Sequence, residues 1–254
     1  MDPRVFLLIC LAAASRHQPS PALEVEVEVT TGPKHEFNET DFQRLRDGVN
    51  SIGPWKTIEL GDMEIWPSFL KAHPKEGLDL FKKLVREDVL GAFRKAAAES
   101  PVWPMLLETH NAEAWRLFQK LAQDYHADVR KAAAISPAWP MLLETHNVSA
   151  WQLFQKLAKD KRGGVRERAA KSPAWPMLLQ THTAEAWHLF KKLATEDDYA
   201  NVREKAAISP AWPMLLETHN AEAWPLFQKL AKDEAQVREK AAISPAWPML
   251  LETH

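Results

Sequence analysis

The chain has 254 residues, of which 46% are hydrophobic and 26% charged, and its formal net charge is −2. This is the composition of a folding sequence rather than a disordered one, and the small net charge provides no general attraction to nucleic acid or to anionic membranes. No stretch approaches the roughly 20 apolar residues that a membrane-spanning helix needs. A single cysteine, Cys10, excludes an intrachain disulfide.

The first 22 residues contain two segments that we expect to lie outside the folded repeats. Residues 1–14 have the pattern of a secretory signal peptide, because Arg4 precedes an apolar run that ends in three alanines. The alternative is a short apolar segment packed on the first repeat. A cleaved signal predicts the secretory pathway or the extracellular space, and otherwise a cytoplasmic location is expected. Residues 15–22 are polar and contain proline, which predicts a linker.

Residues 23–65 predict a small α+β cap at the N-terminal end of the array. Apolar and acidic residues alternate over residues 23–29, which is the pattern of a half-buried strand, and residues 56–60 are a second candidate strand. Between them we expect a helix that is capped by Thr40 and ended by Gly53-Pro54. Its apolar face is predicted to consist of Phe42, Leu45, Val49 and Ile52.

The rest of the chain is an internal repeat. A Trp-Pro dipeptide is followed seven residues after the Trp by a His, in residues 66–73, 103–110, 139–146, 175–182, 212–219 and 247–254. Periods of about 36 residues are typical of stacked supersecondary units, each of which buries its apolar face against its neighbours. The predicted units are residues 66–102, 103–138, 139–174, 175–211 and 212–246, with a partial unit 247–254.

Each unit is expected to contain three short helices. The first begins at the Trp-Pro dipeptide, the second near a second Trp, and the third at a Val-Arg dipeptide. In the unit 212–246, Pro225 favours a helix that begins near Trp224, because proline is tolerated in the first helical turn and is costly further in. The alternative is two helices per unit, the longer one running from Pro213 to Lys232 with a kink at Pro225.

The sequence of the third helix resembles that of a known family of helical repeats. Residues 202–207 and 237–242 both read Val-Arg-Glu-Lys-Ala-Ala, which resembles the Val-Arg-x-x-Ala-Ala signature of HEAT repeats. The run Leu-Ala-Lys-Asp, followed by Val-Arg and Ser-Pro, is similar to leucine-rich-repeat-variant units. Over residues 66–254 the resemblance implies a mainly α protein, a right-handed α-solenoid of about five units. Variant-repeat proteins with an iron–sulfur cluster need several cysteines, so no cofactor is implied here.

The repeated histidines and tryptophans allow two interpretations each. The histidines could form a metal-binding column, but consecutive units stand roughly 10 Å apart and a metal lies about 2 Å from its imidazole ligand. We therefore favour histidines that end short helices, where they can bond free carbonyl groups, and we predict no metal site. The tryptophans could form an exposed ladder for sugars, proline-rich peptides or bases, but packing between units is the favoured interpretation.

Positions at which the units differ are the candidates for partner binding. The residue after the second Trp varies among the units as Arg116, Gln152, His188 and Pro225. Such variation fits a surface tuned unit by unit, and neutral drift at exposed positions is the alternative.

The unit 139–174 is the only basic one. Its turn and third helix contain Lys161, Arg162, Arg166 and Arg168. This cluster predicts binding of a phosphate or an acidic partner, and the alternative is a solvated charged face.

These patterns predict a non-enzymatic scaffold that binds a protein or peptide along its surface. The sequence lacks a glycine-rich phosphate loop, a His-Glu-x-x-His motif, a Gly-x-Ser-x-Gly motif and paired zinc-binding cysteines. The alternatives are a nucleic-acid-binding solenoid and an enzyme or chromophore-handling accessory protein with a pocket against residues 23–65. Because the sequence stops after the first helix of a sixth unit, a truncated product or end-to-end self-association is also expected.

Overall fold

A computed structural model describes residues 38–50, 65–86 and 90–253 of the chain. Within these residues the protein is mainly α-helical and has no strand. The predicted signal peptide 1–14, the linker 15–22 and the predicted strands 23–29 and 56–60 lie outside the described residues.

Helix α2 (Glu39–Asn50) forms where the sequence predicts the helix of the cap, and it packs against α4 (Pro74–Leu84). Phe42, Leu45 and Val49 bury their side chains on one face. This spacing of three to four residues is what an amphipathic helix requires.

The residue that caps the N-terminus of α2 differs from the prediction. The side-chain oxygen of Asn38 accepts hydrogen bonds from the backbone N–H groups of Thr40 (2.9 Å) and Asp41 (3.2 Å). Thr40 therefore lies inside the helix, and its predicted role as the N-cap is wrong. Both residue types are good N-caps, and the sequence alone does not separate two candidates two positions apart.

Three helices follow one another in each predicted unit, so the three-helix interpretation is confirmed and the two-helix alternative is wrong. The Trp-Pro helices are α3 (Trp66–Ala72), the first part of α6 (Trp103–Ala122), α8 (Trp139–Thr145), α11 (Trp175–Thr181), α14 (Trp212–Thr218) and α17 (Trp247–Thr253). The second helices are α4, the last part of α6, α9 (Asn147–Ala158), α12 (Thr183–Thr195) and α15 (Asn220–Leu230). The third helices are α5 (Gly91–Glu99), α7 (Ala127–Ala134), α10 (Gly163–Ala170), α13 (Ala200–Ala207) and α16 (Ala235–Ala242).

The break between the first two helices of a unit is at the repeated histidine. His146, for example, has φ −128° and ψ 29°, which ends α8 and starts α9. His110 has the same kind of non-helical backbone (φ −140°, ψ 43°) inside α6, so α6 is two helices joined across a kink.

The second helices therefore begin earlier than predicted. Helix α15 starts at Asn220, and Pro225 lies inside it rather than in its first turn. The prediction of a start near Trp224 is wrong because the histidine, and not the proline, interrupts the chain. A proline at this depth removes one backbone hydrogen bond of the helix and crowds the preceding turn.

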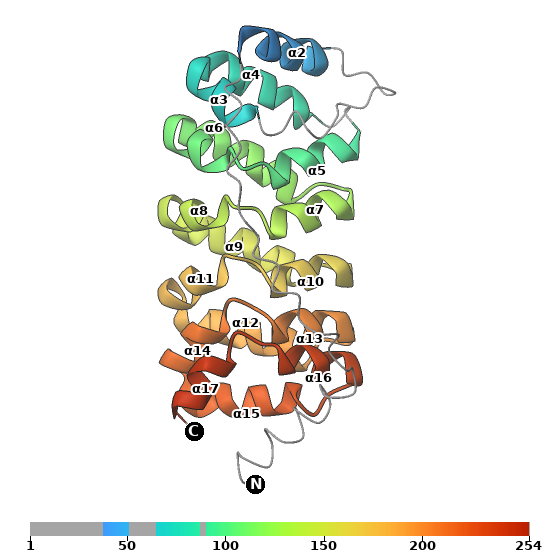
Figure 1. Cartoon of the computed structure of the whole chain (residues 1–254), viewed down its shortest axis with the longest axis vertical. Coiled ribbons are helices and arrows are strands. Elements are labelled where there is room, and N and C mark those ends of the chain that lie inside the picture. Colours follow the sequence, from blue (N-terminus) through green and yellow to red (C-terminus); the bar gives the residue numbers. More distant parts are fainter. Residues whose placement is uncertain (1–37, 51–64, 87–89, 254) are drawn as a thin grey trace, which may run out of the picture.

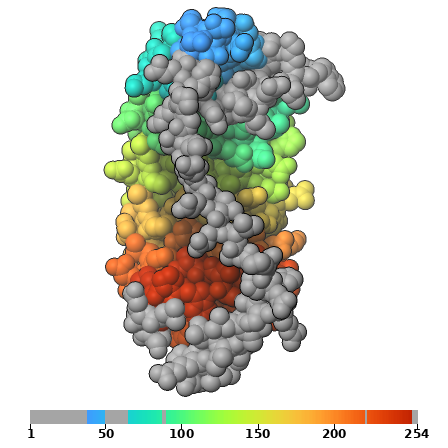
Figure 2. Space-filling view, in the orientation of Figure 1, coloured from blue at the N-terminus to red at the C-terminus, as the bar shows by residue number. Residues whose placement is uncertain are grey.

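The helices stack unit upon unit along the long axis of the molecule. In Figure 1 the Trp-Pro helices lie on the left and the third helices on the right, and each helix packs on its equivalent in the next unit. Figure 2 shows the units following one another in contact, as successive bands of colour. The third helices approach one another closely because their contact faces carry small side chains, such as Ala132 and Ala133 in α7.

An unbroken series of aromatic rings runs through the core. The Trp of each Trp-Pro dipeptide from Trp66 to Trp212 is almost fully buried. From Trp103 onward each lies edge-to-face between a Phe of its own unit and a Phe of the preceding unit: Trp139 is 5.1 Å from Phe154 and 5.2 Å from Phe118, centroid to centroid. The prediction that these tryptophans are packing anchors is confirmed.

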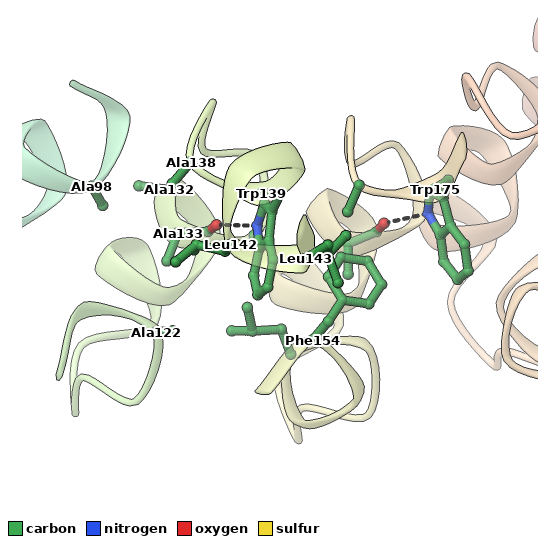
Figure 3. Packing of buried hydrophobic residues seen from close by; sticks show 14 of the residues in the cluster. Ala98, Ala122, Ala132, Ala133, Ala138, Trp139, Leu142, Leu143, Phe154 and Trp175 are labelled. Atoms are coloured by element: carbon green, nitrogen blue, oxygen red, sulfur yellow. Dashed lines mark hydrogen bonds between the residues drawn. The ribbon is translucent and has the colours of Figure 1, made fainter. Parts of the chain in front are cut away.

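The indole N–H groups of these tryptophans also donate hydrogen bonds to carbonyl groups at helix ends. The Nε1–H of Trp139 donates a 2.8 Å hydrogen bond to the carbonyl oxygen of Ala133, in the last turn of α7 (Figure 3). Carbonyl groups in the last turn of a helix lack an intrahelical partner. Equivalent 2.8 Å bonds join Trp103 to Ala97, Trp175 to Ala169, Trp212 to Ala206 and Trp247 to Ala241. Phenylalanine could not make these bonds, because it has no N–H group to donate.

Candidate partner-binding surface

The four variable positions form a column on the second helices. Arg116, Gln152, His188 and Pro225 occupy the same place in α6, α9, α12 and α15, and all four are exposed. We call this set the variable column. Each member follows a Trp that packs inward, so the helix itself directs these side chains toward solvent.

A lysine lies one turn after each member of the variable column. Lys120, Lys156, Lys192 and Lys229 are exposed and share a helical face with the variable position four residues earlier. We call these four residues the lysine column. The sequence shows the same Lys in every unit, and a comparison of the positions that differ between units does not single it out.

The surface around the two columns is hollowed between neighbouring second helices. A cavity of about 640 Å³ is lined by residues of α6 that include Arg116, Gln119 and Lys120. A second cavity, of about 370 Å³, lies between α12 and α15 and is lined by Lys191, Pro225 and Lys229 among others. Both cavities are lined by cations and by the apolar stems of long side chains, and each also has carboxylates at its edge, Asp124 in the first and Glu196 and Glu222 in the second.

The predicted basic cluster is not one surface. Lys161 and Arg162 are exposed in the turn before α10, whereas Arg168 is half-buried on α10 and lines a cavity of about 140 Å³. Arg166 is engaged in the protein interior: its Nε lies 2.6 Å from Asp197, and its Nη1 donates a 2.8 Å bond to the carbonyl of Asp160. Its charge is therefore already compensated by the next unit.

Arg166 belongs to a ladder of ion pairs that joins successive units. The bidentate pairs, with Nε to carboxylate distances of 2.6–2.7 Å, are Arg94–Asp124, Arg130–Asp160, Arg166–Asp197 and Arg203–Asp233. These ion pairs thus explain why an Arg follows the Val near the start of the third helices. Their partners could have been found in the sequence, because an Asp follows each Arg after 30 or 31 residues.

The Arg203–Asp233 pair of the ladder stabilises the fold in a pH-dependent way. The side-chain hydrogen bond from Arg203 lowers the pKa of Asp233, against a smaller opposing effect of burial. A carboxylate whose pKa is lower in the folded state stabilises that state above its ordinary pKa near 4. This stabilisation is lost as the pH falls through the lowered pKa.

The repeated histidines end helices as predicted, but the ring of His146 stacks on a tryptophan instead of bonding a free carbonyl group. The backbone N–H of His146 donates to the carbonyl of Leu142 (2.8 Å). Its ring stacks on Trp115 of the preceding unit at 4.8 Å and 17°, and its Nε2 contacts the side-chain oxygen of Asn111. The expected bond from the ring to a free carbonyl is wrong for this residue. The rings of His182 and His219 stack in the same way on Trp151 and Trp187.

This stacking makes stability depend on the charge of His146. Burial lowers the pKa of His146, so the unfolded chain takes up the proton first as the pH falls below about 6.5. We expect the free energy of unfolding, measured with urea, to fall between pH 7.5 and pH 5.5. His146→Gln should reduce that difference. His188→Gln, at an exposed histidine, should leave it unchanged, and equal curves for all three proteins would contradict this prediction.

The proline inside α15 provides a second test. Replacing Pro225 by Gln, the residue at this position in α9, restores a backbone donor inside the helix. We expect the free energy of unfolding to rise by about 1–3 kcal/mol. The reciprocal change Gln152→Pro should lower it by a similar amount. Thermal unfolding followed by circular dichroism measures both, and a Pro225→Gln protein that melts at or below the wild-type temperature would refute this view of the helix.

The described ranges, 38–50, 65–86 and 90–253, contain neither a helix that could span a membrane nor a group of side chains that could hold a metal ion. No helix in them is both long enough and apolar enough to cross a lipid bilayer. In the same ranges no group of three or more His, Cys, Asp or Glu side chains is placed so that it could hold a metal ion. Beyond the chain itself, no protein-family model and no curated protein matches this sequence.

Proposed function

We propose that this protein is an α-solenoid scaffold, right-handed and HEAT-like, that binds a protein or peptide without catalysing a reaction. The observation that carries the proposal is that the series of aromatic rings in the core is the same in every unit, whereas the exposed variable column is not. Trp139 and Phe154 recur with almost identical geometry in every unit, whereas the exposed position that follows the second Trp is Arg, Gln, His and Pro in turn. A scaffold needs constant contacts to keep its units in register and different side chains where it selects a partner.

The resemblance to HEAT and leucine-rich-repeat-variant units adds support, because the third helices carry the Val-Arg-x-x-Ala-Ala pattern. Solenoids with this architecture present extended surfaces on which many weak contacts add up. The ladder and the aromatic core order this surface before a partner arrives, which lowers the entropic cost of binding.

Photo-crosslinking tests the proposal. A benzoylphenylalanine placed at position 152 or 188, in the variable column, should form adducts with a discrete protein or peptide in an extract of the cells that make this chain. The same group placed at position 131 or 240, on the third helices, is the control and should not form these adducts. Equal labelling from both faces, adducts with nucleic acid alone, or adducts only between two copies of this chain would refute the proposal.

A further inference from the structure

The lysine column differs from the lysines of the third helices. The third helices also carry one exposed or half-buried lysine in most units, and each of these has a carboxylate within 4.0 Å. These pairs are Lys95–Glu99, Lys131–Asp128, Lys205–Glu204 and Lys240–Glu239. Within the described part of the chain, Lys120, Lys156, Lys192 and Lys229 take part in no ion pair.

The surroundings of the lysine column carry charges of both signs, because Asp124 lines one neighbouring cavity and Glu196 and Glu222 line the other. Further exposed cations are Arg116 and Lys191 on the same helices, and Lys159 and Lys232 just after the ends of α9 and α15. A row of lysines without ion-pair partners in a chain whose net charge is −2 is a local feature, and not the result of a basic composition. Such a row attracts an anionic partner and repels a cationic one.

The spacing of the column favours an extended polypeptide. Packed helices lie roughly 10 Å apart, so one lysine is presented about every 10 Å along the stack. An extended chain rises about 3.3 Å per residue. A carboxylate at every third residue would therefore meet one lysine per unit, while the side-chain amides of Gln119, Gln155 and Gln228 beside the column can bond the backbone of the bound chain.

A single-stranded nucleic acid fits this surface less well. Proteins that bind such strands combine a basic groove with exposed aromatic rings on which the bases stack. Here the ring of Trp115 is stacked on His146, that of Trp151 on His182 and that of Trp187 on His219. These indoles are already occupied.

We propose that the lysine column binds an extended acidic segment of a partner protein, with carboxylates about three residues apart, and that the variable column selects among such segments. This inference rests on the proposed scaffold function and specifies the chemistry of its partner. The bound segment lies across the second helices of successive units and uses the cavities between them.

Fluorescence anisotropy with a defined probe tests the inference. The probe is a fluorescein-labelled peptide of 12 residues, with Glu at every third position and Gly or Ser between. A peptide with Gln in place of Glu and a single-stranded DNA of 12 nucleotides are the comparison ligands. We expect the full-length chain to bind the Glu peptide about tenfold more tightly than the Gln peptide, since several exposed ion pairs of modest strength act together. Binding of the Glu peptide should weaken as salt is added.

Two matched variants locate the site. K120Q/K156Q/K192Q/K229Q removes the lysine column, and K95Q/K131Q/K205Q/K240Q removes the same number of charges from the third helices. The first should lose about tenfold in affinity for the Glu peptide, and the second should stay within about twofold. Equal losses in both variants, no preference for Glu over Gln, or tighter binding of the DNA would each overturn the inference.

The outcome is separable from that of the proposed function. If crosslinking from positions 152 and 188 captures a partner whose affinity is unchanged in K120Q/K156Q/K192Q/K229Q, the scaffold function stands and the acidic-segment inference falls. If neither column is involved in binding that partner, both fall.

Discussion

Replacement of Trp139 by alanine is expected to lower the free energy of unfolding by about 3–5 kcal/mol. Its side chain is fully buried and lies edge-to-face between Phe118 and Phe154. The substitution opens a cavity at the seam between two units and also leaves the carbonyl of Ala133 without its 2.8 Å hydrogen bond. Urea unfolding followed by circular dichroism measures the loss.

A graded series separates the two contributions. Trp139→Phe keeps an aromatic ring in the seam but removes the N–H donor, so its cost should be smaller than that of Trp139→Ala. Gln152→Ala, at an exposed position of the next helix, is the control and should stay within about 0.5 kcal/mol of wild type. A Trp139→Ala protein as stable as this control would show that the aromatic series does not hold the units together.

Replacement of Asp160 by alanine is expected to lower the free energy of unfolding by about 2–4 kcal/mol. Asp160 receives the Nε and Nη2 groups of Arg130 at 2.6 and 3.1 Å and the backbone N–H of Arg162 at 2.8 Å. Only 11% of each side chain in the ion pair is exposed, so water does not readily replace the lost carboxylate. The cost arises chiefly because the Arg130 cation stays largely buried without its counter-charge.

A double-mutant cycle identifies that cause. When Arg130→Met is combined with Asp160→Ala, the loss should be smaller than the sum of the two single losses, because no unpaired charge remains. Lys161→Ala, at the exposed neighbouring residue, should be nearly neutral. Strictly additive losses would mean that the two side chains act independently, contrary to the ladder described above.

Much of the fold could be predicted from the sequence because each unit faces a copy of itself. The period of about 36 residues, the buried Trp of each Trp-Pro dipeptide and the three helices per unit all follow from local patterns that repeat. The exact helix starts could not be predicted in the same way. Pro225 has the residue type of a first helical turn, yet the backbone conformation of His219, which no propensity scale encodes, decides where α15 begins.

The candidate surface was predicted in part. The variable column lies together on one exposed face, as its shared position in the repeat implies. The basic cluster of the unit 139–174 was misleading, because a count of charges along the chain does not reveal that Arg166 faces Asp197 from the next unit. For the same reason, the unpaired state of the lysine column is apparent only in three dimensions.

Each ion pair of the ladder runs from one unit to the next. This arrangement has a consequence for how the number of units in such a chain can change. Every arginine reaches forward to the aspartate of the following unit, and Phe118 and Phe154 meet the next tryptophan at the same distance of 5.2 Å. Excision of residues 139–174 would bring Arg130 to Asp197 and Phe118 to Trp175, which are partners of the original kind. Whole modules can therefore be gained or lost by duplication or deletion without new compensating substitutions at the join.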